Sequence, residues 1–136
     1  MAIFKDYLEN KSPLILHGAL GTEMESLGYD ISGKLWSAKY LLEKPEVIQK
    51  IHETYVAAGS DLITTSSYQA TLPGLIDAGL TKEEAEQIIA LTVQLAKNAR
   101  DKVWATLDET EKAKRPYPLI SGDVGPSAAY LANGSE

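Results

Sequence analysis

The sequence predicts an α/β fold built on parallel strands. Three short apolar runs recur along the 136 residues, at 12–18, 62–65 and 118–122. A longer amphipathic pattern separates each run from the next, and only two residues lie between the first pattern and the second run. Strands that alternate with helices pair in parallel through right-handed crossovers. The length indicates about one domain.

Each apolar run has the composition of a strand that is buried on both faces. The run at 12–18 is closed by a glycine, the run at 62–65 is rich in β-branched residues, and the run at 118–122 again ends in a glycine. Short continuous apolar runs of this kind are typical of parallel sheets covered by helices. A short helix at about 3–9 is expected to precede the first strand.

Residues 45–59 carry the signals of a first long helix. Pro45 suits the first helical position, and Gly59 suits the left-handed residue that commonly ends a helix. Apolar side chains recur at spacings of three and four, and they are Val47, Ile48, Ile51, Tyr55 and Val56. His52 lies on the same segment, and we expect it at a surface or boundary position.

A second long helix is expected from Lys82 to about Leu107. Thr81 and Glu84 have the spacing of a capping box at its start. Its apolar stripe consists of Ala85, Ile88, Ile89, Thr92, Leu95, Ala96, Ala99 and Val103. The charged stretch at 108–115 is expected to be a solvated loop.

The composition excludes several classes of function. With 19 acidic and 13 basic residues the net charge is −6, which argues against nucleic-acid or anionic-membrane binding. No apolar run has the roughly 18 residues of a membrane span, and the first residues lack the pattern of a signal peptide. We therefore expect a cytoplasmic protein. The chain contains no cysteine, and its two separate histidines do not make a zinc site.

Ligands of parallel α/β folds bind at the carboxyl ends of the strands. Three clusters follow the predicted strands, at 17–23, 66–69 and 122–126. The spacing of Gly18 and Gly21 matches neither dinucleotide nor nucleotide fingerprints, which leaves a tight turn or a close approach to a ligand.

Five side chains at these ends have a structural and a functional interpretation. His17 is more simply a packed, hydrogen-bonded residue than a catalyst. Trp36 either covers the strand ends or forms an electron-rich wall for a cationic ligand. Tyr68 and Gln69 share this ambiguity and lean towards function, whereas Asp123 is favoured as a turn residue over a catalytic carboxylate.

Six motifs follow one another in an order that is known from one family. They are LILHGALGTE at 14–23, LWSAK at 35–39, PEVI at 45–48, AGSDLITTSSYQAT at 58–71, VGP at 124–126 and AYLANGSE at 129–136. Together they resemble the N-terminal portion of homocysteine S-methyltransferases, in the branch that uses S-methylmethionine or S-adenosylmethionine and no cobalamin.

The resemblance implies a (β/α)₈ TIM barrel, a fold that needs about 250 residues. The chain would supply about three of the eight βα units, so residues 1–136 are expected to form a single incomplete homocysteine-binding domain. The pattern agrees, because a loop but no helix follows the third predicted strand.

The resemblance also implies a reaction. A methyl group would move from a sulfonium donor to homocysteine to give methionine. Zinc would activate the thiol, because metal coordination deprotonates thiols at neutral pH. The family holds zinc through three cysteines in later strands. We therefore expect no zinc on this chain, and no activity from it alone.

The resemblance implies that this chain supplies part of the substrate-binding surface. It implies no catalytic residue and no metal ligand on this chain. The implied substrate-binding residues are His17, Gly18, Ala19, Trp36, Ser66, Ser67, Tyr68, Gly125 and Pro126. Many relatives carry aspartate where His17 stands and an aromatic residue where Ser127 stands. An aspartate would hold the substrate ammonium through a charge-assisted hydrogen bond, and a neutral histidine offers a weaker one.

A second hypothesis is a stand-alone, non-catalytic binding or self-assembling α/β module derived from that family. Open edges of a parallel sheet favour self-association, so we expect a dimer or a larger assembly. An unrelated small α/β enzyme is a third alternative, but the sequence offers no self-contained catalytic constellation for it.

Overall fold

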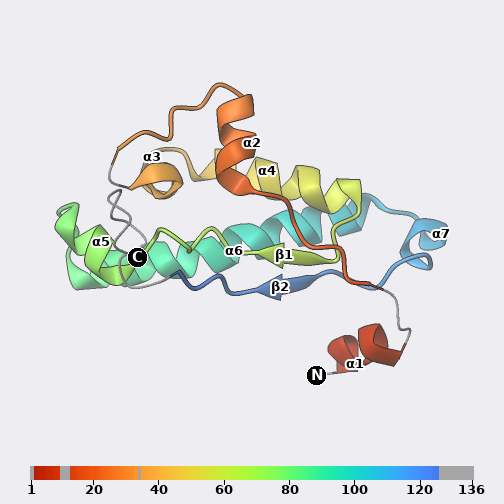
Figure 1. The fold of residues 1–136 in the computed structure, drawn as a ribbon. Coiled ribbons are helices and arrows are strands. Elements are labelled where there is room, and N and C mark those ends of the chain that lie inside the picture. Colours follow the sequence, from red (N-terminus) through yellow and green to blue (C-terminus); the bar gives the residue numbers. More distant parts are fainter. Residues whose placement is uncertain (1, 10–12, 34, 126–136) are drawn as a thin grey trace.

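The computed structural model describes residues 2–9, 13–33 and 35–125. Its elements run in the order α1 (Ala2–Glu9), α2 (Leu20–Ser26), η1 (Trp36–Ala38), α3 (Lys39–Glu43), α4 (Pro45–Ala58), β1 (Leu62–Thr64), α5 (Leu72–Asp77), α6 (Lys82–Thr106), α7 (Glu109–Lys112) and β2 (Leu119–Ser121). Figure 1 shows α6 running along the two strands, with α4 beside it. The parallel α/β fold that the sequence predicts is therefore confirmed.

The sheet pairs its strands in parallel and in chain order. Leu62 of β1 faces Leu119 of β2, and Thr64 faces Ser121. The prediction of a full strand at 12–18 is wrong for the described residues, because 13–18 form only an isolated parallel bridge between Leu16 and Leu62. This run has a partner on one side, and 58% of Leu16 remains exposed.

The long helices cover one face of these strands. Ile63 of β1 is completely buried against Val56 of α4 and Ala96 of α6. Val103 and Ile120 pack onto the same cluster. Burial of a side chain of this size contributes about 1.5–3 kcal/mol, so this small cluster anchors the helix layer to the strands.

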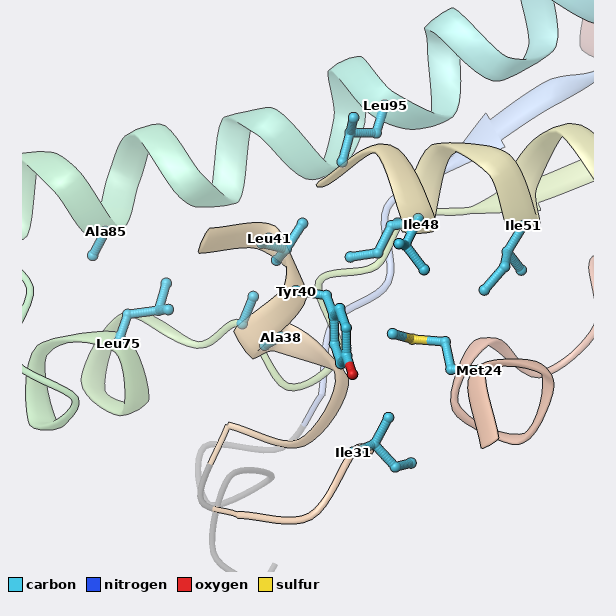
Figure 2. Close-up of a cluster of buried hydrophobic side chains, with 12 residues drawn as sticks. Met24, Ile31, Ala38, Tyr40, Leu41, Ile48, Ile51, Leu75, Ala85 and Leu95 are labelled. Atoms are coloured by element: carbon cyan, nitrogen blue, oxygen red, sulfur yellow. The ribbon is translucent and has the colours of Figure 1, made fainter. Parts of the chain in front are cut away.

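The larger apolar cluster lies beyond the carboxyl ends of the strands. Side chains from five helices converge there (Figure 2), among them Met24, Tyr40, Leu41, Ile48, Ile51, Leu75, Ala85 and Leu95. The cluster fixes α2, α3 and α5 against α4 and α6. It therefore gives a firm base to the loops that follow the strands.

Most helix limits agree with the sequence. Gly59 ends α4 with a φ of 108°, and Thr81 and Glu84 form the expected capping box of α6. The helix expected near 3–9 is α1. The prediction of a loop throughout 108–115 is wrong, because Asp108 and Glu111 form a second capping box that starts the short helix α7.

Candidate functional site

A cavity of about 480 Å³ opens at the carboxyl ends of the strands. It lies where parallel α/β folds bind their ligands. The residues that line it are Leu16, His17, Gly18, Ala19, Leu20, Gly21, Ser37, His52, Thr64, Thr65, Ser66, Tyr68, Gln69 and Asp123. The structure thus brings together parts of all three predicted clusters.

The loop after the first apolar run rests directly on α4. The Tyr55 hydroxyl donates a hydrogen bond to the Ala19 carbonyl over 3.2 Å, and its ring lies 4.3 Å from the ring of His17. A Cβ on Gly18 would lie only 2.4 Å from Tyr55 Cε1. Gly18 therefore allows a close approach of the loop backbone to α4, a role that differs from both the tight turn and the approach to a ligand considered from the sequence.

His17 and His52 form a buried pair beneath this loop. His17 Nε2 lies 2.8 Å from His52 Nδ1, and Thr64 Oγ1 lies 3.5 Å from His17 Nδ1. The prediction of a surface or boundary position for His52 is wrong, since the residue is 0% exposed. Ile48, His52 and Val56 are four residues apart and share the buried face of α4, a signal already present in the sequence.

Both histidines are held in the neutral form. Burial lowers the pKa of His17 from 6.5 to about 4, although a hydrogen bond with the Gly18 backbone acts in the opposite direction. Burial and then the neighbouring His17 lower the pKa of His52 to about 3. Neither ring therefore repels a cationic ligand group at neutral pH.

Hydroxyl groups join the end of β1 to the loop after β2. Thr65 Oγ1 lies 2.7 Å from Ser67 Oγ and accepts a hydrogen bond from the Asp123 amide over 2.9 Å. Ser67 Oγ donates to the Asp123 carbonyl. Ser66 lies between Thr65 and Ser67 in the sequence and is buried. Its Oγ has no hydrogen-bond partner among the described residues. Ser67 thus holds the loops together, whereas Ser66 has an unused polar atom.

The aromatic residues differ in their relation to the cavity. Tyr68 lines it and is exposed, and Gln69 lines it while accepting a hydrogen bond from Ser37 over 3.2 Å. Trp36 is 37% exposed, has a φ of 48° and is not among the described lining residues. Ser37, the residue that follows Trp36 in the chain, lines the cavity instead.

The third predicted cluster is only partly described. Asp123 lines the cavity, and Gly125 does not belong to the described lining. Pro126 lies outside the described residues, as does Ser127. The sequence analysis did not predict three contacts that shape the site, those made by Tyr55, Thr65 and Asp123. Each of these residues contacts a partner more than 30 positions away, so only the fold reveals its role.

The residues present do not fit a zinc ion. The chain has no cysteine, and no group of three histidine, aspartate or glutamate side chains with suitable geometry occurs in the described part. His17 and His52 face one another.

No described helix is long and apolar enough to cross a membrane.

The model of the family Homocysteine S-methyltransferase matches residues 14–136. The chain belongs to this family. It is 45% identical over 123 residues to the homocysteine S-methyltransferase YbgG of Bacillus subtilis, and 40% identical over 129 residues to the homocysteine S-methyltransferase of Escherichia coli. These matches cover 90% and 95% of this chain, but 38% and 40% of the relatives. The chain thus spans about two fifths of their length.

Solved structures of the family carry the same fold. The oxidized form of the E. coli homocysteine methyltransferase MmuM superposes with a TM-score of 0.85 at 38% identity, covering 98% of this chain and 44% of that one. A metallated form gives a TM-score of 0.78, with 94% and 43% covered. The fold of the chain is therefore an N-terminal part of a (β/α)₈ barrel, with about three βα units.

Proposed function

We propose that the chain forms the part of a homocysteine S-methyltransferase site that binds the amino-acid end of the substrate. Residues 1–136 would be part of one homocysteine-binding barrel domain. The observation that carries the proposal is the cavity at the strand ends, whose loop 17–19 is seated on α4 in a chain of this family. The reaction would transfer a methyl group from S-methylmethionine or S-adenosylmethionine to homocysteine.

In this reaction the homocysteine sulfur attacks the methyl carbon of the sulfonium donor. The bond between that carbon and the donor sulfur breaks, a neutral thioether leaves, and the thiol proton is released to solvent. A deprotonated thiol is the nucleophile, and zinc on ligands outside this chain would supply that activation. The chain itself would bind and orient the amino-acid end, which lowers the barrier by alignment.

The proposed binding surface offers two kinds of polar group that could hold the amino-acid end of the substrate. The loop 17–19 and Gly21 offer backbone, and Ser66, Tyr68 and Gln69 offer side chains at the end of β1. Trp36 is proposed to line the pocket for the methyl donor, and Gly125 and Pro126 are proposed to shape the third loop. Because the chain contains no cysteine and its described residues form no group that could hold a metal ion, we expect the purified chain with zinc and both substrates to form no methionine.

A chimera tests the proposal directly. Residues 14–136 would replace the matching segment of the E. coli relative, and methionine formation from homocysteine and S-methylmethionine would be measured. We expect turnover, and a Ser66→Ala chimera should show a higher KM for homocysteine. A Thr54→Ala chimera is the matched control, because Thr54 is exposed on α4 and its side chain donates a hydrogen bond to the Lys50 carbonyl of the same helix. A folded chimera without turnover would contradict the proposal.

A further inference from the structure

A closed ring of three hydrogen bonds joins the end of β1 to the loop after β2. The Asp123 amide donates to Thr65 Oγ1 over 2.9 Å, Thr65 Oγ1 lies 2.7 Å from Ser67 Oγ, and Ser67 Oγ donates to the Asp123 carbonyl. We call this ring the hydroxyl bridge. Thr65 is only 3% exposed, so the bridge is largely shielded from water on that side.

The chemistry of the partners fixes the direction of every bond in the hydroxyl bridge. An amide can only donate and a carbonyl can only accept, so Asp123 donates to Thr65 and accepts from Ser67. Each hydroxyl carries a single proton, and the proton of Ser67 is directed at the Asp123 carbonyl. Thr65 is therefore the donor in its contact with Ser67. Neither hydroxyl has a proton left for a ligand.

The hydroxyl bridge continues the pairing of the two strands beyond their last residues. The Thr65 amide donates to the Ser121 carbonyl over 2.9 Å, as in a regular parallel ladder. The next bond of such a ladder would run from the Asp123 amide to the backbone carbonyl of Thr65. The Asp123 amide donates to the Thr65 side chain instead. Hydroxyl groups thus hold the loop after β2 where the backbone ladder ends.

The hydroxyl bridge connects two walls of the candidate cavity. Thr65, Ser66 and Asp123 line this cavity, whereas Ser67 does not belong to the described lining. The resemblance implies that Ser67 binds the substrate. Its place in the bridge indicates a different role, because its proton is committed to the backbone of the loop.

We propose that Thr65 and Ser67 are positioning residues of the candidate site. Their hydroxyls hold the loop after β2 against the end of β1, and they act on a ligand only through the placement of these two walls. Ser67 donates no hydrogen bond to the ligand. That the ligand is homocysteine rests on the proposed function.

Hydrogen exchange of the Asp123 amide, followed by NMR, tests the bridge on the chain itself. Valine is similar to threonine in shape but lacks the hydroxyl, so Thr65→Val should speed this exchange by about two- to tenfold, the range of one hydrogen bond. Thr65→Ser keeps the hydroxyl and should restore slow exchange. Ser66→Ala is the matched control for the exchange, because Ser66 Oγ has no partner among the described residues. Unchanged exchange in Thr65→Val, or the same acceleration in Ser66→Ala, would overturn the proposal.

Binding of L-homocysteine to the chain tests how the two hydroxyls act on a ligand. We expect Thr65→Val and Ser67→Ala each to weaken binding by about two- to tenfold. The double variant should bind about as weakly as either single variant, because either change alone opens the bridge. A direct contact of Ser67 with the ligand would instead add its loss to that of Thr65→Val. Additive losses, or full affinity in both single variants, would overturn the proposal.

The two measurements separate this proposal from the proposed function. No binding of L-homocysteine by the parent chain would contradict the proposed function, and the exchange of the Asp123 amide would then decide the positioning role. Faster exchange in Thr65→Val, with slow exchange restored in Thr65→Ser, would uphold that role. Unchanged exchange would overturn it.

Discussion

At the scale of single residues, the loop at the candidate site depends on the absence of a side chain at one position. Gly18 leaves room for the Tyr55 ring, and a Cβ there would meet Tyr55 Cε1 at 2.4 Å. We expect Gly18→Ala to destabilise the chain by about 1–3 kcal/mol, the usual cost of overpacking. Urea unfolding measures this change.

Gly21 provides the matched control for that substitution. A Cβ on Gly21 would meet only Ile31 Cδ1, at 3.4 Å, and the residue lies within α2. Alanine favours a helix over glycine by about 1 kcal/mol. Gly21→Ala should therefore be neutral or stabilising. Equal stability of the two variants would contradict the close approach of Gly18 to α4.

The buried histidines make the stability of the chain depend on pH. The folded pKa values of about 4 and about 3 lie below the ordinary 6.5, so the unfolded chain takes up protons first as the pH falls. Stability is then complete above pH 6.5. Below it, each histidine should remove about 1.4 kcal/mol per pH unit. Urea unfolding between about pH 6.5 and 5 measures the slope.

Variants without histidine separate this effect from the carboxylates. Glu53 has a lowered pKa because hydrogen bonds from Gln49 and Lys102, with the Lys102 charge, outweigh its burial. Such carboxylates lose stabilisation only nearer their own ordinary pKa of about 4.3. A His17→Phe, His52→Leu double variant should thus have a flat profile above pH 5. A slope that survives in it would show another origin.

At the scale of elements, the start of α6 is fixed by a capping box. Thr81 Oγ1 accepts a hydrogen bond from the Glu84 amide, and Glu84 accepts one from the Thr81 amide over 2.8 Å. Thr81→Ala removes the side-chain acceptor and should cost about 1 kcal/mol in unfolding free energy. Thr54→Ala, within α4 and exposed, should be neutral or slightly stabilising. The same loss in both variants would contradict a specific role of the cap.

At the scale of the whole molecule, the first apolar run is the least covered part of the sheet. Leu14, Ile15 and Leu16 are all exposed, and the described run pairs with β1 only at Leu16. Exposed edges and apolar patches favour association. We expect the purified chain to form a dimer or a larger assembly, which light scattering would measure.

Two substitutions of equal exposure test where association occurs. Leu16 is 58% exposed on the edge run, and Leu27 is 57% exposed after α2. Leu16→Lys should shift the chain towards the monomer because it places a charge on the edge. Leu27→Lys should not. A monomeric parent chain, or the same shift in both variants, would contradict association through the edge.

Local patterns were sufficient for the elements whose signals are contained in one segment. Pro45 and Gly59 define α4, and Thr81 with Glu84 starts α6, because caps and turns act within a few residues. The strand at 12–18 was less predictable, since pairing depends on a distant neighbour and not on composition. The motifs also predicted the family and its barrel fold, which the comparisons confirm.

The sequence by itself determined the parallel α/β class, the long helices, the family and the region of the candidate cavity. Only the tertiary structure decided that Ser67 holds two loops together, and that His52 and Tyr55 support the loop at His17. The physical reason is how far apart in the sequence the interacting residues lie. Helix caps and apolar periodicity are interactions between near neighbours, whereas these contacts join residues that are 35 to 56 positions apart.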